Sequence, residues 1–171
     1  MSDDEILAAT HRVINRLGPH GFTLADVSAE VGLAPATLVQ RFGSKRGLLL
    51  AFARSGVDYA NECFTALRTK HKSALAAVVA AATQLPQVMT TPEEVARGLA
   101  FFEMDVLDDD FRRLTAESFR LQIQAYTALL TEAVRAGELV HCDTKALARA
   151  YSGPYAWPTA FRSFSDRKSV V

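Results

Sequence analysis

A long stretch without a carboxylate is the feature of this chain with the clearest chemical consequence. Between Val31 and Val57 there is no Asp or Glu. The cationic side chains of the same stretch are Arg41, Lys45, Arg46 and Arg54. Guanidinium and ammonium groups bind phosphate, and a phosphate responds to the charge within a Debye length of about 8–10 Å rather than to the total. The chain has a net charge of zero, so the sequence predicts a local phosphate-binding patch on a neutral protein.

Two short helices are expected to position this patch. Thr23, followed three residues later by Asp26, predicts a capped helix over Leu24–Val31. Pro35 suits a first helical position and predicts a second helix over Pro35–Phe42. Two short helices joined by a tight turn and followed by a basic segment are typical of a helix-turn-helix DNA reader. The second helix must be short and begin with small residues so that its N-terminal half can enter a major groove about 12 Å wide.

The second helix also predicts which side chains face outward. Leu38 and Phe42 are four residues apart, so both are expected to face a small core. That arrangement leaves Thr37, Gln40 and Arg41 directed outward, where they could reach phosphates or base edges. Gln40 and Arg41 could still be solvated surface, because many polar contacts in such complexes only position the protein.

The rest of the chain predicts longer helices, and no segment shows the alternation of a strand. The fold class is therefore all-α, with an N-terminal three-helix helix-turn-helix domain over residues 1–47 and a C-terminal helical bundle over residues 48–171. The other helices are expected at about Asp3–Leu17, Lys45–Lys70, Ser73–Leu85, Pro92–Leu107, Asp108–Ala136, and from Asp143 past Trp157. We interpret Asp108, Asp109 and Asp110 as a helix start rather than a metal site, because carboxylates are stabilised there by the helix dipole.

The motif itself resembles a known family. The segment "GFTLADVSAEVGLAPATLVQRFGSKRGLL" resembles the N-terminal domain of the TetR family of bacterial transcriptional regulators, and "GLAFFEMDVLDDDFRRL" and "LLTEAVRAGEL" are more weakly similar to its ligand-binding half. The resemblance implies a homodimer whose C-terminal domain dimerises and encloses a small-molecule pocket. It implies a ligand-responsive repressor that releases double-stranded operator DNA on binding a small, mostly apolar effector.

The resemblance and the outward-facing positions together give a predicted DNA-binding set. Its members are Thr23, Pro35, Ala36, Thr37, Gln40, Arg41, Lys45 and Arg46. The sequence departs from the family pattern at Ala34, where a Ser commonly caps the helix, and at Val39, where an aromatic residue is usual. Arg41 and Arg46 also replace other residue types, and both could restore attraction to phosphate. The chain ends soon after the tryptophan-bearing segment, so the dimer interface is expected to be reduced or built differently.

The larger domain holds a set of aromatic, Met and amide side chains that could line the effector pocket. They are Phe64, Met89, Phe102, Met104, Phe119, Gln122, Tyr126, Tyr155 and Trp157. Residue by residue, such side chains are also ordinary core. Gln122 is the most informative member, because an amide on an apolar helix face requires a hydrogen-bond partner, which could be a ligand or another side chain.

Other classes of protein are not favoured. The sequence has no enzyme motif such as GxSxG or a phosphate-cradling glycine loop, so an enzyme is not expected. Cys63 and Cys142 lack metal-ligand spacing, and we expect neither a metal nor a cofactor. An acidic start without a long apolar run predicts a cytoplasmic protein with no membrane partner. The alternative is a helical small-molecule-binding or scaffolding protein whose helix-turn-helix no longer binds DNA.

Overall fold

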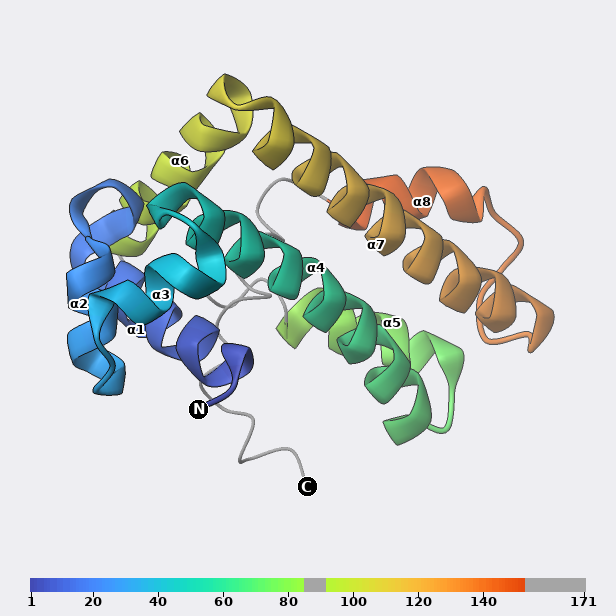
Figure 1. Ribbon diagram of the computed structural model, residues 1–171. Coiled ribbons are helices and arrows are strands. Elements are labelled where there is room, and N and C mark those ends of the chain that lie inside the picture. Colours follow the sequence, from blue (N-terminus) through green and yellow to red (C-terminus); the bar gives the residue numbers. More distant parts are fainter. Residues whose placement is uncertain (85–91, 153–171) are drawn as a thin grey trace.

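The computed structural model describes residues 1–84 and 92–152, except for the side chains of Ala60, Gln84 and several positions between 93 and 105. The described residues form helices and no strand, which confirms the all-α fold (Figure 1). The helices are α1 (Asp3–Gly21), α2 (Leu24–Val31), α3 (Pro35–Phe42), α4 (Lys45–Lys70), α5 (Ala74–Gln84), α6 (Pro92–Leu107), α7 (Asp109–Arg135) and α8 (Thr144–Tyr151). No helix in the described parts is long and apolar enough to cross a membrane.

The break predicted near Gly18 is present, but α1 does not end there. Gly18 has φ +76° and ψ 163°, which interrupts the helical backbone. Pro19 then begins one further turn that reaches Gly21. Proline tolerates this position because it needs no hydrogen bond from its own nitrogen at the start of a turn. The expected end at Leu17 was therefore right about the interruption and wrong about the residues beyond it, which return to helix.

The caps around the helix-turn-helix agree with the sequence. Thr23 and Asp26 form the predicted capping box, in which each side chain accepts a hydrogen bond from the other residue's main-chain nitrogen. Gly32 ends α2 with φ +68°, a left-handed conformation that glycine adopts at little cost. Ala34 provides no side-chain cap for α3. Ser44 caps α4 by accepting a hydrogen bond from the nitrogen of Gly47.

Two apolar cores hold the described helices together, and α4 contributes to both. The first core joins α1 to α3 with the beginnings of α4 and α7, and includes Phe22, Leu38, Leu48, Phe52 and Phe111. The second joins the far halves of α4 and α7 with α5 and α8, and includes Phe64, Val78, Tyr126, Leu130 and Ala148. Because side chains of α7 pack into the first core, packing continues across the boundary predicted at residue 47, and that boundary stays a prediction.

Helices α4 and α7 lie side by side and run in the same direction (Figure 1). Three arginines of α4 each form an ion pair with a carboxylate at the corresponding turn of α7 or at its N-cap. The pairs are Arg46 with Asp108, Arg54 with Glu117, and Arg68 with Glu132. The sequence separations of these pairs are 62, 63 and 64 residues. The nearly constant offset shows that the two helices keep one register along their shared length.

Candidate nucleic-acid interface and effector site

Helix α3 presents one face to the core and the other to solvent, as the sequence predicts. Leu38 is fully buried, and Phe42 packs against the same core while remaining partly exposed. On the opposite face Ala36, Gln40 and Arg41 are exposed. The remaining positions of interest there are Pro35 and Val39, which are exposed, and Thr37, which is half-buried. The N-terminal half of α3 is therefore accessible to a groove, although contact with DNA stays a prediction.

The cations of the acid-free stretch are engaged by other parts of the chain. Arg41 donates to the main-chain oxygen of Met1 and to the Asp3 carboxylate, both at 3.1 Å. Lys45 donates to the main-chain oxygen of His20 at 2.8 Å and lies 4.5 Å from the centre of the Phe22 ring. Burial lowers the pKa of Lys45. These two side chains thus hold α3 and α4 against α1, and DNA would have to compete for them.

Arg46, predicted to hold a DNA phosphate, is instead occupied within its own chain. Its guanidinium binds the start of α7, with hydrogen bonds to Asp108 at 2.9 and 2.8 Å and to Asp110 at 2.7 Å. The hydrogen bonds from Arg46 hold the pKa of the Asp108 carboxyl below its usual range. Arg54 is similarly bound to Glu117 at 2.6 Å. Arg46 therefore joins two helices of this chain, and a phosphate would have to displace two carboxylates from it.

Thr23 is also engaged within its own motif. Its main-chain nitrogen and its hydroxyl each donate to Oδ2 of Asp26 at 2.7 Å. Thr23 belongs to the predicted DNA-binding set, and these are the two donors with which it could bind a phosphate. The same hydrogen bonds lower the pKa of Asp26, which keeps the carboxylate charged. A phosphate at Thr23 would have to replace a carboxylate that already occupies both donors.

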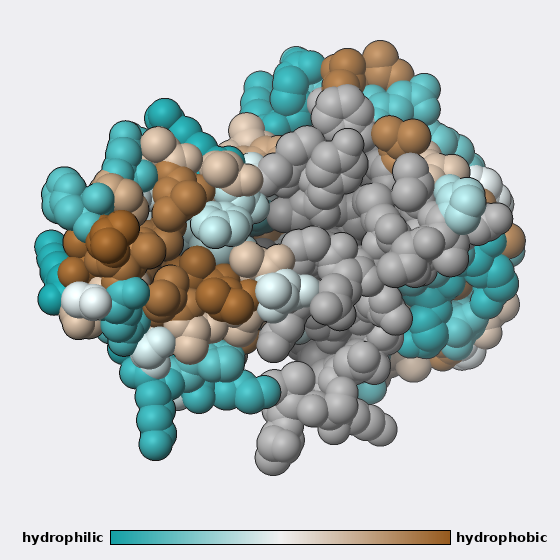
Figure 2. Space-filling view, turned by 180° about the vertical axis from the view of Figure 1, so that it is seen from behind, coloured by the Kyte–Doolittle hydropathy of each residue, from teal (hydrophilic) through white to brown (hydrophobic). Residues whose placement is uncertain are grey.

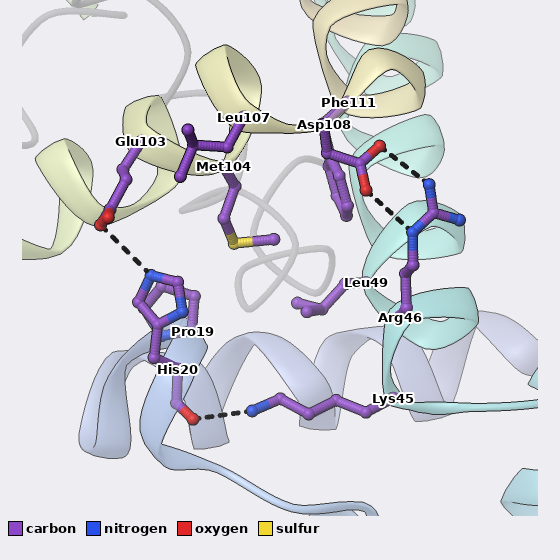
Figure 3. Close-up of a pocket in the computed structure, with 10 residues that line it drawn as sticks. All are labelled: Pro19, His20, Lys45, Arg46, Leu49, Glu103, Met104, Leu107, Asp108 and Phe111. Carbon is purple, nitrogen blue, oxygen red and sulfur yellow. Dashed lines mark hydrogen bonds and ion pairs between the residues drawn. The ribbon is translucent and has the colours of Figure 1, made fainter.

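A cleft opens between the end of α1, the start of α4, the end of α6 and the start of α7 (Figure 3). Its volume is about 550 Å³, and it is lined by Leu49, Met104, Leu107 and Phe111 together with polar residues at its rim. On one side His20 lies 3.6 Å from Glu103, and on the other Arg46 binds Asp108 (Figure 3). Met104, predicted to line the effector pocket, lies in this cleft.

The structure does bring three of the predicted pocket residues together, between α4 and α7. Phe64 packs edge-on against Tyr126 with ring centres 4.8 Å apart. Gln122 is 4% exposed and donates from its amide nitrogen to the Ser118 hydroxyl at 3.2 Å, while its Oε1 is buried without a partner among the described residues. Burial raises the pKa of Tyr126 to about 12, so the phenol is neutral. A buried amide oxygen without a partner is costly and is the group that a ligand with a donor would satisfy.

The space beside Gln122 is closed in this form. It is lined by Val57, Asn61 and Phe64 from α4 and by Ser118, Leu121 and Gln122 from α7, and it has no room for a water molecule. An effector placed here must separate α4 from α7. Since α4 begins directly after α3, such a separation would also act on α3.

The other predicted pocket residues are not part of this cluster or cannot be placed. Phe119 is half-buried and does not line the closed space. Met89, Tyr155 and Trp157 lie outside the described residues, as does the side chain of Phe102. Tyr151 was missed as a site residue: it stacks on Tyr126 with ring centres 5.7 Å apart. Tyr151 follows Leu147 by four residues, which places both on the same face of α8, and this spacing was the signal that the sequence offered.

Together the fold and the exposed face of α3 define a helix-turn-helix protein with a helical C-terminal part. Residues 6–52 match the family described as bacterial regulatory proteins, tetR family. The N-terminal part of the chain is therefore similar to the DNA-binding domain of that family, and the curated relatives that the chain resembles are transcriptional regulators.

Curated relatives agree with this assignment. The chain is 33% identical over 112 residues to the HTH-type transcriptional regulator BetI of Agrobacterium fabrum, which covers 64% of this chain and 53% of that protein. It is 32% identical over 117 residues to BetI of Brucella melitensis, covering 64% and 56%. The chain thus spans about half the length of the curated relatives it matches.

Solved structures share the fold. A transcriptional regulator from Saccharomonospora viridis in complex with choline superposes with a TM-score of 0.71 at 24% identity, over 86% of this chain and 78% of that one. FadR from Bacillus subtilis in complex with stearoyl-CoA superposes with a TM-score of 0.67 at 16% identity, over 95% and 84%. These likenesses support the architecture of both parts of the chain.

Proposed function

We propose that this protein is a ligand-responsive repressor that binds operator DNA through α3 and releases it when a small, mostly apolar molecule binds near Gln122. The observation that carries the proposal is the orientation of α3, which buries Leu38 and exposes Ala36, Gln40 and Arg41. Side chains so placed at the start and along one face of a short helix are able to meet base edges in a major groove. Acting on bacterial DNA, the protein would work in the cytoplasm.

The proposal includes a homodimer, because two recognition helices must fill half-sites about 34–36 Å apart. Apolar side chains gather at the end of the molecule formed by α5, α7 and α8 (Figure 2). Among the exposed apolar side chains, Val79 of α5 is 53% exposed, Tyr151 at the end of α8 43%, and Val140 between α7 and α8 81%. Exposed apolar surface of this kind favours burial against a second copy.

The closed space between α4 and α7 suggests how effector and DNA are linked. An effector that wedges the two helices apart binds only the form in which α4 has moved, and that form carries a different spacing of recognition helices. A ligand shifts such an equilibrium only by its differential affinity for the two forms. Weakening DNA binding 100-fold requires a preference of about 2.7 kcal/mol.

Choline is the first specific effector to test, and it is a cation rather than the mostly apolar molecule expected from the sequence. The regulator from Saccharomonospora viridis was solved with choline. In this chain the aromatic rings of Phe64, Tyr126 and Tyr151 contact one another in a row, and Phe64 lines the space beside Gln122. Aromatic faces attract quaternary ammonium groups. The choline hydroxyl would donate to Gln122 Oε1. A compact ligand would also need the smallest separation of α4 from α7.

The test is fluorescence anisotropy with the promoter fragment beside the protein's own gene, compared with a random duplex at two salt concentrations, with and without choline. We expect promoter-specific binding that falls with salt, and release by choline. Gln40→Ala should change base preference, whereas Lys45→Ala should weaken every sequence alike. Equal binding to promoter and random DNA would overturn the proposal that the protein is a regulator. Specific binding that choline leaves unchanged would overturn only the proposal that choline is the effector.

The alternative is a helical ligand-binding or scaffolding protein whose α3 no longer contacts DNA. The engagement of Arg41, Lys45, Arg46 and Arg54 by other parts of the chain favours this alternative. It predicts no binding to any duplex at about 50 mM salt, where non-specific attraction is strong. The same titration therefore decides between the two functions.

A further inference from the structure

The acidic first turn of α1 lies against the end of the recognition helix α3. Arg41 stands in the last turn of α3 and donates from Nη1 to Asp3 Oδ1 and to the main-chain oxygen of Met1, both at 3.1 Å. The Arg41 side chain is 37% exposed and the Asp3 side chain 64%. Both members of the pair are therefore accessible to solvent beside the exposed face of α3, although they are far apart in sequence.

The carboxylates around this pair oppose a phosphate, and the N-terminal ammonium of Met1, 3.9 Å from Glu5, offsets part of their charge. Asp3, Asp4 and Glu5 form the first turn of α1. Glu5 accepts a hydrogen bond from the Ser2 nitrogen at 2.6 Å, which keeps it at the same place. A phosphate that approaches Arg41 meets the Asp3 carboxylate already bound to the guanidinium, so Arg41 has little net attraction for distant phosphates.

We propose that Asp3 is a positioning residue of the DNA-binding surface: by holding Arg41, it withdraws one cation from non-specific phosphate binding and so raises the discrimination between sites. This inference rests on the proposed function. Exposed ion pairs are weak, so a duplex that seats α3 in its groove can still displace Asp3. Arg41 then contributes to DNA binding at sites where α3 is fully seated in the groove, and it contributes little to binding at other sites.

The experiment uses the full chain and measures binding to the promoter fragment and to a random duplex between about 50 and 200 mM KCl, where phosphate contacts dominate the salt dependence. The variants are Asp3→Asn, Asp3→Glu, Asp4→Asn, Arg41→Ala and the double variant Asp3→Asn with Arg41→Ala. Asp4→Asn is the matched control, because it removes the same charge from the neighbouring position.

We expect Asp3→Asn to tighten binding to the random duplex several-fold and to steepen its salt slope by about one, the value for one added phosphate contact. The ratio of promoter to random affinity should fall. Asp3→Glu should keep the wild-type slope, and Asp4→Asn should change it less than Asp3→Asn does. The double variant should behave like Arg41→Ala, because Asp3 acts through Arg41.

Three results would overturn the inference. They are an unchanged salt slope in Asp3→Asn, an equal change of the salt slope in Asp4→Asn, or tighter binding to the random duplex by Asp3→Asn that persists when Arg41 is also replaced. These comparisons on the random duplex do not depend on operator recognition. If the wild type binds its promoter no better than random DNA, the proposed function fails while the slopes still decide the role of Asp3.

Discussion

The Arg46 guanidinium of α4 binds both carboxylate oxygens of Asp108, with Nε 2.9 Å from Oδ2 and Nη2 2.8 Å from Oδ1. Asp108 is also the N-cap of α7 and accepts a hydrogen bond from the Asp110 nitrogen at 2.9 Å. One carboxylate thus joins the starts of two parallel helices. Because α4 follows α3 directly, this pair connects the helix-turn-helix to α7, the helix that carries Gln122.

Removing the guanidinium by Arg46→Gln should lower the melting temperature at pH 7. Arg46 lowers the pKa of Asp108 in the folded state, so its contribution to stability is present above the unfolded carboxyl pKa of about 3.9 and is lost as the pH falls through the folded pKa. The difference in melting temperature between wild type and variant should therefore become smaller from pH 7 toward pH 3. Thermal unfolding at several pH values measures it, with Arg120→Gln as an exposed control on α7. A gap that stays constant with pH would contradict the pairing.

Gly47→Ala should disturb the junction between α3 and α4. A Cβ at Gly47 would lie 1.9 Å from the main-chain oxygen of Phe42, which cannot move without shifting the end of α3. Alanine is favoured over glycine in helices by about 1 kcal/mol, so a loss of stability would report the clash. We expect a lower melting temperature and roughly tenfold weaker promoter binding, about 1.4 kcal/mol. Gly21→Ala is the control, since its nearest neighbour, the Leu17 Cβ, is 4.0 Å away.

Ala34→Ser should stabilise the protein. Ala34 occupies the N-cap of α3 with an extended backbone and makes no side-chain hydrogen bond there. A serine hydroxyl at this position accepts from the first turn and is worth about 0.5–1 kcal/mol. For a chain of this size the melting temperature should rise by about 2–4 °C. Ala136→Ser, an exposed change at the C-terminal end of α7, should show no such rise in the same calorimetric scan.

His11 should make the protein sensitive to mild acid. The ring is 6% exposed, stacks on Phe52 with ring centres 6.0 Å apart, and has its pKa lowered to about 4 by burial. The unfolded state binds the proton at about pH 6.5, so stability is complete above that pH and declines as the pH falls toward 4. The decline should amount to about 3 kcal/mol. Urea unfolding between pH 7 and pH 4.5 measures it, and His11→Gln should flatten the dependence.

Local signals in the sequence were sufficient for the two short helices α2 and α3 and for their ends. Thr23 and Asp26 form the expected capping box, and Gly32 and Gly43 end the two short helices. These features depend on residues within one turn of each other, so they can be read from spacing alone. The inward orientation of Leu38 followed from the same local geometry.

The electrostatics of the site could not be read in this way. The stretch from Val31 to Val57 contains no acidic residue. In the folded protein, however, its arginines form ion pairs with carboxylates from α1 and from the start and middle of α7, namely Asp3, Asp108 and Glu117. Likewise Met104 and Gln122 were assigned to one effector pocket by residue type. The fold instead places Met104 in the cleft beside Leu49 and Phe111, and Gln122 between α4 and α7.

The sequence by itself determined the helical class, the caps, the exposed face of α3 and the resemblance to the TetR family, because each rests on neighbours along the chain. Only the tertiary structure decided which cations remain available and which polar atoms lack a partner. Arg46 and Asp108 are separated by 62 residues, and their contact exists because α4 and α7 pack in parallel at one register. Charge neutralisation depends on distance in space, and that distance is set by packing.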